Sequence, residues 1–117
     1  MLFVCYPKCS TCGKARAWLE NNGLEFTERD IKTDNPTADE LRAWHEKSGL
    51  PWKRFFNTSG QLYRGMGLSG KVDSMGEDEI VSLLASDGML VKRPILVADN
   101  DAVLVGFREK DWAAALL

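Results

Sequence analysis

The sequence has one histidine, three cysteines and no long apolar run, and each shortage excludes a class of protein. A structural zinc site usually takes four Cys or His ligands, and His45 lies far along the chain from all three cysteines. We therefore expect no metal site. No apolar run approaches the ~18–20 residues that cross a bilayer, so we also expect no membrane segment.

A surplus of positive charge is also missing. Fifteen Lys and Arg stand against seventeen Asp and Glu, a formal net charge of −2. Because proteins that bind nucleic acid carry a basic surplus, we expect no direct contact with nucleic acid. The beginning of the chain lacks a basic stretch followed by a cleavage site, and the odd cysteine count does not suit a disulfide-stapled secreted domain. These features predict a cytoplasmic protein with reduced thiols.

The first third of the chain predicts a strand–helix–strand unit. Residues 2–6 are a continuous apolar run ended by Pro7, which is typical of a buried strand. Residues 10–22 have helical spacing of apolar side chains and are followed by Gly23, a typical end of a helix. Residues 25–31 alternate, which predicts a second strand, parallel to the first.

The rest of the chain predicts helices followed by a hairpin. Thr37 and Glu40 have the spacing of a capping box, so a helix is expected from Thr37 to about Gly49. The following segment is expected to be helical and irregular. A further helix, ended by Gly88, two antiparallel strands and a last helix are then predicted at residues 77–86, 95–98, 102–107 and 109–117. This order, βαβ, helical insertion, ββα, predicts an α/β thioredoxin-like fold with a mixed four-stranded sheet.

The motif Cys9-Ser10-Thr11-Cys12 directly follows the first strand and opens the first helix. The free N–H groups and the dipole of a helix N-terminus favour a thiolate, so Cys9 is the candidate nucleophile. Cys12 lies about one turn away and is the candidate resolving thiol. The alternative is that both are small buried residues; we favour redox chemistry because strand, turn and helix all fit the motif. Cys5, inside the strand, is expected to be a packed core thiol.

Arg93-Pro94 is the second signal. In the thioredoxin-like order, a proline before the third strand packs opposite the cysteine motif and is commonly cis, so Pro94 is a cis-proline candidate. Arg93 would then lie beside Cys9, where it can lower the thiol pKa and hold an oxyanion together with the helix start at Ser10 and Thr11. The alternative is an exposed surface arginine.

The segments 6–19, 56–60, 92–95 and 105–107 resemble the arsenate reductase-like (ArsC) family and, within it, the Spx/MgsR-type branch. The resemblance covers nearly the whole chain. It implies a single domain over residues 1–117, with a thioredoxin-like core at residues 1–33 and 89–117 and a helical insertion at residues 34–88.

That family implies two kinds of function. Glutaredoxin-linked arsenate reductases attack arsenate with one cysteine, matched here by Cys9, and form a mixed disulfide with glutathione. They hold the anion with arginines, of which Arg93 matches one. Spx-type regulators use both cysteines, matched by Cys9 and Cys12, as a redox switch and bind the C-terminal domain of the RNA polymerase α subunit.

The chain departs from the reductase pattern at three positions. Cys5 stands where those reductases have a histidine, Asn57 aligns with an arginine, and their last arginine falls at Phe107, one position before Arg108. Lys53, Arg54 and Arg64 are candidate replacements from the insertion.

The sequence thus predicts a cytoplasmic thiol-redox protein without a bound cofactor. It would act on a small oxyanion or a disulfide, with glutathione and glutaredoxin or thioredoxin as candidate electron donors. The alternative is an Spx-type transcription regulator.

Overall fold

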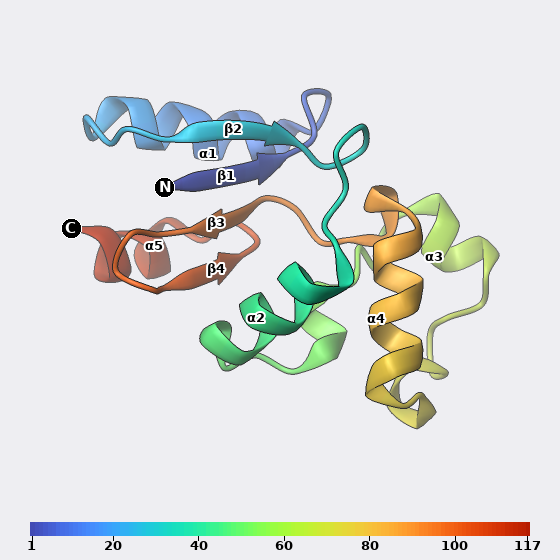
Figure 1. Cartoon of the computed structure of the whole chain (residues 1–117). Helices are drawn as coiled ribbons and strands as arrows, with labels where there is room; N and C mark the ends of the chain where they lie inside the picture. Colours follow the sequence, from blue (N-terminus) through green and yellow to red (C-terminus); the bar gives the residue numbers. More distant parts are fainter.

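Four short strands form one mixed sheet in the order β2-β1-β3-β4 (Figure 1). β1 (Leu2–Cys5) runs parallel to β2 (Thr27–Asp30) and antiparallel to β3 (Ile95–Val97), and β4 (Val103–Val105) is antiparallel to β3. The computed structural model describes all 117 residues. It confirms the predicted α/β class, the parallel first pair and the mixed four-stranded sheet.

The strands are shorter than the sequence predicts. β2 begins at Thr27 rather than at residue 25, because its neighbour β1 offers only four residues for pairing. β4 ends at Val105, because Gly106 has a positive φ of 75° and turns the chain out of the sheet. The alternation of apolar and polar residues and the β-propensity of a segment do not indicate where its partner strand ends.

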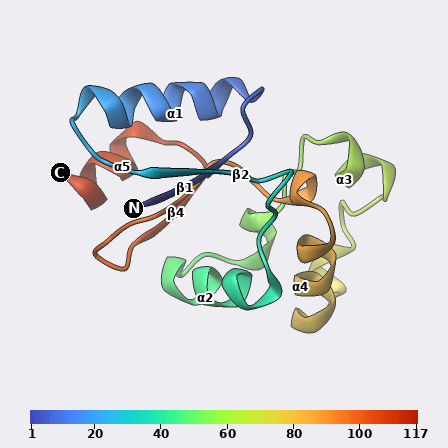
Figure 2. The same ribbon diagram turned by 45° about the horizontal axis from the view of Figure 1, so that its top comes forward.

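The sheet buries both faces, as the continuous apolar run of β1 requires. Phe3 and Cys5 pack in one core layer with α1 (Ser10–Asn21) and α5 (Glu109–Leu116), whereas Val4 packs in the other layer with α2 (Ala38–Ser48). Figure 2 shows α1 on one side of the sheet and α2 on the opposite side. The side chain of Cys5 therefore points toward α1, the helix that begins at the cysteine motif.

The segment between β2 and β3 is helical and irregular, as predicted. Beyond α2 it contains three short 3-10 turns and two α-helices: η1 (Trp52–Phe55), α3 (Gln61–Gly65), η2 (Val72–Ser74), α4 (Glu77–Ser86) and η3 (Gly88–Leu90). α2 packs against α4 and β4. The insertion thus covers one face of the sheet and continues beyond its end (Figure 1).

The predicted capping box at the start of α2 is confirmed. The Thr37 hydroxyl accepts a hydrogen bond from the Glu40 N–H at 3.1 Å, and the Glu40 carboxylate accepts one from the Thr37 N–H at 3.0 Å. The same carboxylate takes two hydrogen bonds from Arg29 of β2, at 2.6 and 2.9 Å. This pair joins the first helix of the insertion to the sheet.

The predicted bounds of α4, residues 77–86, are confirmed, but the residue that caps its end is Asp87 and not Gly88 as predicted. The helix ends at Ser86, and Asp87 caps the next turn by accepting a hydrogen bond from the Met89 N–H at 2.9 Å. Gly88 is required for a close approach instead, because a Cβ there would overlap the Ile31 carbonyl oxygen and lie 2.7 Å from its carbon.

None of the helices is long and apolar enough to span a lipid bilayer.

Candidate active site

Cys9 occupies the N-cap position of α1. Its N–H donates to the Tyr6 carbonyl at 3.0 Å, which fixes the tight turn between β1 and the helix. No side chain caps α1, and its first turn holds no acidic residue, so the first N–H groups are free to stabilise a negative charge at Cys9. Of the three cysteines, Cys9 is the one that is partly exposed, whereas Cys5 and Cys12 are buried.

The pKa of the Cys9 thiol is lowered. Partial burial alone would raise it, but the N–H groups of Cys12 and Thr11, the Cys12 thiol and the Arg93 guanidinium together outweigh burial. Each of these groups donates to the thiolate rather than to the thiol, so each favours the charged form. Since the thiolate is the nucleophilic form, the surroundings of Cys9 are those of an activated cysteine.

Cys12 is fully buried behind Cys9. Its sulfur accepts a hydrogen bond from the Tyr6 N–H at 3.3 Å. Burial raises its pKa to about 12; the Tyr6 N–H opposes this rise, and the nearby Cys9 adds to it. The pKa values of the two thiols are therefore shifted in opposite directions: the surroundings favour the thiolate form of Cys9 and the protonated form of Cys12.

Arg93 precedes β3, and its peptide bond to Pro94 is cis. The guanidinium lies over the Tyr6 ring, and the distance from Cζ of Arg93 to the ring centroid is 5.1 Å. One of its terminal nitrogens, Nη1, is buried and has no hydrogen-bond partner. Because buried donors are nearly always satisfied, this unpartnered nitrogen makes Arg93 a candidate binding group for an anion near Cys9. Tyr6 was not singled out from the sequence for this role, although it begins the segment that resembles the ArsC family.

Ser10 and Thr11, the other predicted site residues, are exposed in the first turn of α1. Thr11 lines a small cavity together with three basic side chains, Arg54, Lys92 and Arg108. Arg54 and Arg108 were named from the sequence as cations near the site, whereas Lys92 was not. The side-chain amide of Asn57, which aligns with an anion-binding arginine of the reductases, donates instead to the Met89 carbonyl at 3.4 Å.

Cys5 is a fully buried thiol, as predicted. Arg16 donates to its sulfur at 3.5 Å and to both oxygens of Glu28, at 2.7 and 3.1 Å. Burial, and then the Glu28 charge, raise the pKa of Cys5 to about 11, against a smaller opposite effect of Arg16. Cys5 therefore remains protonated and enclosed at neutral pH.

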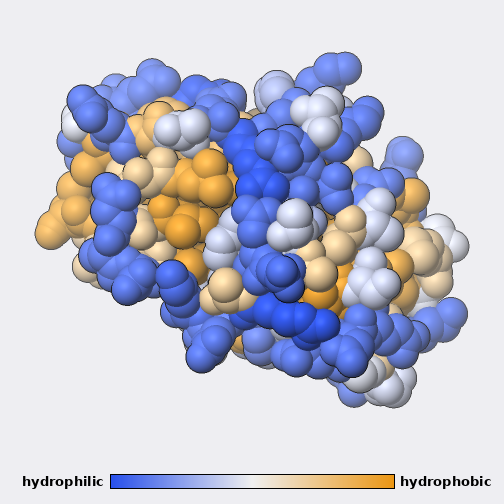
Figure 3. Space-filling view, in the orientation of Figure 1, coloured by the Kyte–Doolittle hydropathy of each residue, from blue (hydrophilic) through white to orange (hydrophobic).

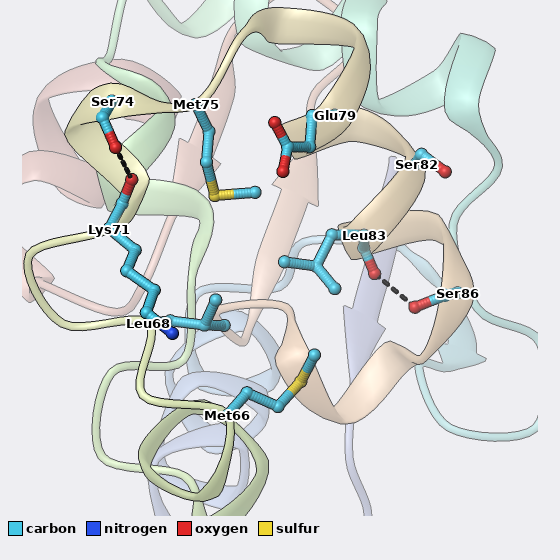
Figure 4. A pocket seen from close by; sticks show the side chains of 9 residues that line it. All are labelled: Met66, Leu68, Lys71, Ser74, Met75, Glu79, Ser82, Leu83 and Ser86. Atoms are coloured by element: carbon cyan, nitrogen blue, oxygen red, sulfur yellow. Dashed lines mark hydrogen bonds between the residues drawn. The ribbon is translucent and has the colours of Figure 1, made fainter.

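A cavity of about 620 Å³ is lined by residues between Met66 and Ser86, far along the chain from the cysteines. Figure 4 shows Met66, Met75 and Leu83 pointing into it from the segments around α3, η2 and α4. In the space-filling view, apolar surface also gathers on the side where α3 and α4 lie (Figure 3). Because the cavity contains no cysteine, histidine or arginine, it contributes nothing to the thiol site. No group of three or more His, Cys, Asp or Glu side chains is placed to hold a metal ion.

A thioredoxin-like fold with a Cys-x-x-Cys motif at the start of its first helix defines a class of proteins that carry out thiol chemistry. The ArsC family profile matches residues 5–115, so the chain belongs to the ArsC family, a family of thiol-redox proteins. This confirms the resemblance seen in the sequence.

Individual relatives support the same conclusion. The chain is 51% identical over 117 residues to the uncharacterized protein YusI of Bacillus subtilis, covering 97% of this chain and 98% of YusI. It is 30% identical over 107 residues to the regulatory protein MgsR of the same organism, covering 92% of this chain and 82% of MgsR. The crystal structure of a putative ArsC family related protein from Bacteroides fragilis superposes with a TM-score of 0.93 at 52% identity, covering 97% of this chain and 94% of that one.

Proposed function

We propose that this protein catalyses thiol–disulfide exchange, with Cys9 as the nucleophile and Cys12 as the resolving thiol. The observation that carries the proposal is the asymmetry of the two thiols. Cys9 is partly exposed with a lowered pKa, whereas Cys12 is buried with a raised pKa, at the start of one helix. An accessible thiolate backed by a protonated thiol suits an attacking and a resolving cysteine.

The reaction proceeds in two exchanges. The Cys9 thiolate attacks one sulfur of a substrate disulfide, and the other sulfur leaves as a thiol after taking a proton. Cys12 then attacks the Cys9 sulfur, releases the second substrate thiol and leaves a Cys9–Cys12 disulfide. Once Cys9 is in a mixed disulfide, its negative charge no longer raises the pKa of Cys12, so Cys12 loses its proton more easily.

An oxyanion is the second candidate substrate for the same thiolate. The unpartnered Nη1 of Arg93 and the N–H groups at the start of α1, where no side chain caps the helix, favour an anion next to Cys9. By resemblance to the ArsC family, arsenate is the candidate oxyanion, and glutathione with glutaredoxin, or thioredoxin, is the candidate electron donor. We place this activity in the cytoplasm, in one domain whose core is residues 1–33 and 89–117 and whose insertion is residues 34–88.

A regulatory function is the alternative, and the 30% identity to MgsR favours it. In that case the Cys9–Cys12 pair would act as a redox switch, and the partner would be the C-terminal domain of the RNA polymerase α subunit. A pull-down with that domain, using reduced and oxidised protein, tests this alternative. Binding that depends on the redox state would favour the regulator over the enzyme.

The test of the main proposal is trapping of the mixed disulfide. Wild-type protein, Cys12→Ser and Cys5→Ala are each treated with a small disulfide and measured by intact-mass and peptide mass spectrometry. We expect wild type and Cys5→Ala to lose two hydrogens through a Cys9–Cys12 bridge, and Cys12→Ser to retain an adduct on Cys9. An adduct on Cys9 that persists in wild-type protein would show that Cys12 does not resolve it.

A further inference from the structure

A cavity of about 170 Å³ opens beside the first turn of α1 and is distinct from the position of the Cys9 sulfur. Its polar lining consists of Thr11, Arg54, Lys92 and Arg108, and the end of β4 with the following residues to Phe107 forms its apolar wall. We call it the basic cavity. It brings together cations from three separate segments next to the helix that begins at Cys9.

Backbone hydrogen bonds fix these segments relative to one another. The Lys92 N–H donates to the Phe55 carbonyl at 2.8 Å, so η1 and the loop before β3 are joined directly beside Arg54 and Lys92. The Gly106 N–H donates to the Pro94 carbonyl, also at 2.8 Å. Gly106 has a φ of 75°, and a Cβ there would lie 3.4 Å from Cε of Lys92. The cavity is therefore bounded by ordered backbone.

The positive charge of the basic cavity is not neutralised within the protein. None of Arg54, Lys92 and Arg108 forms an ion pair with a carboxylate. Asp111 lines a neighbouring hollow with both arginines, yet it is in no ion pair either. Three like charges that converge without an ion-paired carboxylate favour an anionic ligand group.

The basic cavity is separate from the cation that serves the thiolate. Arg93 lies over the Tyr6 ring and lowers the pKa of Cys9. Lys92, which directly precedes Arg93, lines the basic cavity together with Thr11, whereas Arg93 does not line it. A simple oxyanion bound to Arg93 would leave the basic cavity without a ligand. Two cationic positions next to one thiolate fit a substrate that carries a second negative group.

We propose that Arg54, Lys92 and Arg108 form a carboxylate subsite that selects small sulfur compounds with a carboxylate near the reacting sulfur. The proposal rests on the proposed function, since it places the reacting sulfur at Cys9. The size of the cavity supports a small compound: about 170 Å³ is below the volume of pockets that enclose drug-sized ligands, so it takes one end of a substrate.

The test compares two aromatic disulfides that differ in charge. Dithiobis(nitrobenzoate) carries a carboxylate on each ring, and dithiodipyridine is neutral. With either probe the Cys9 thiolate attacks one sulfur, the S–S bond breaks, and the aryl thiolate that leaves is followed by absorbance. Both rates are divided by the rate of mercaptoethanol with the same probe, which removes the difference in leaving group. The ratio of the two normalised rates, anionic over neutral, measures the subsite.

We expect wild-type protein to favour the anionic probe about tenfold at low salt, the size of a modest electrostatic steering effect. Arg54→Gln, Lys92→Gln and Arg108→Gln should each reduce the ratio at least about threefold, and high salt should also reduce it. Lys110→Gln is the matched control, because Lys110 is an exposed cation of α5 that lies outside the cavity lining. It should leave the ratio unchanged.

A wild-type ratio near one would overturn the subsite. Equal losses in Lys110→Gln and Arg54→Gln would also overturn it, because they would reflect the general charge of the surface. Failure of the proposed function has a different signature: at neutral pH, Cys9 would then react with the neutral probe no faster, per total thiol, than mercaptoethanol does. The ratio would still decide on the subsite.

Discussion

The ion pair between Arg29 of β2 and Glu40 of α2 attaches the insertion to the sheet, so replacing Glu40 by Gln tests that attachment. Hydrogen bonds from Arg29, and to a lesser extent the Thr37 N–H, lower the pKa of Glu40 to about 2 against the opposing effect of burial. Glu40→Gln retains a side-chain oxygen for the Thr37 N–H but removes the charge. The expected decrease in the free energy of unfolding therefore comes from loss of the ion pair and not from loss of the helix cap.

The size of the expected loss in the free energy of unfolding follows from the linkage between proton binding and folding. A fall in the pKa of Glu40 from the ordinary value of 4.5 to about 2 corresponds to about 3 kcal/mol of folding stability at neutral pH, at ~1.4 kcal/mol per pKa unit. The side chains are 14% and 32% exposed for Arg29 and Glu40, so we expect about 1–2 kcal/mol after solvent screening. Because the folded-state pKa is lowered, this stabilisation is complete above the unfolded-state pKa and is lost as the pH falls toward 2.

The assay is urea unfolding of wild type, Glu40→Gln and Asp39→Asn at pH 7 and pH 3. Asp39 is the matched control: it lies in the same first turn and is exposed, but it forms no ion pair. Glu40→Gln should lower the free energy of unfolding by about 1–2 kcal/mol at pH 7 and by less than half as much at pH 3. A loss of equal size at both pH values, or an equal loss in Asp39→Asn, would refute this reasoning.

Two further substitutions, Gly88→Ala with Gly65→Ala as its control and Arg93→Gln, test the attachment of the insertion and the thiol site. Gly88→Ala should lower the free energy of unfolding by at least about 2 kcal/mol, because its Cβ would overlap the Ile31 carbonyl; Gly65→Ala in α3, with nothing within 4 Å of its Cβ, should change it little or raise it. Thermal unfolding would contradict this if the two variants had the same midpoint. Arg93→Gln should raise the pKa of Cys9, since a cation that favours the thiolate is lost. An unchanged pH profile of Cys9 alkylation would show that Arg93 does not act on the thiol.

Sequence patterns were reliable where a local rule determines the structure. The apolar run of residues 2–6, the helix that begins at Ser10 and the capping box at Thr37 each depend on neighbouring residues, and the structure contains all three elements. The positions of Cys9 and Cys12 at the start of that helix follow from the same local rules. The redox role of these two residues remains a prediction.

Contacts between distant segments could not be predicted. Gly65, Gly67 and Gly70 within the insertion do not mark such contacts: a Cβ at Gly65 or Gly70 would meet nothing, and Gly67 and Gly70 have a positive φ. The close approach occurs at Gly88, against a residue that precedes the insertion.

The basic cavity illustrates the same limit. Lys92 joins Arg54 and Arg108 only because the η1 segment pairs with the loop before β3, and no local pattern in the sequence predicts that pairing.

The central claim is that the fold makes Cys9 the activated thiol, and a titration of the Cys9 thiol tests this claim most directly. Thiolate absorbance in the ultraviolet is followed against pH for wild type, Cys9→Ser and Cys12→Ser, with alkylation and peptide mapping to assign each transition. We predict one transition below ~8.5, the ordinary pKa of a cysteine, that belongs to Cys9 and is absent from Cys9→Ser. A first transition at or above that value, or one that persists in Cys9→Ser, would contradict the account.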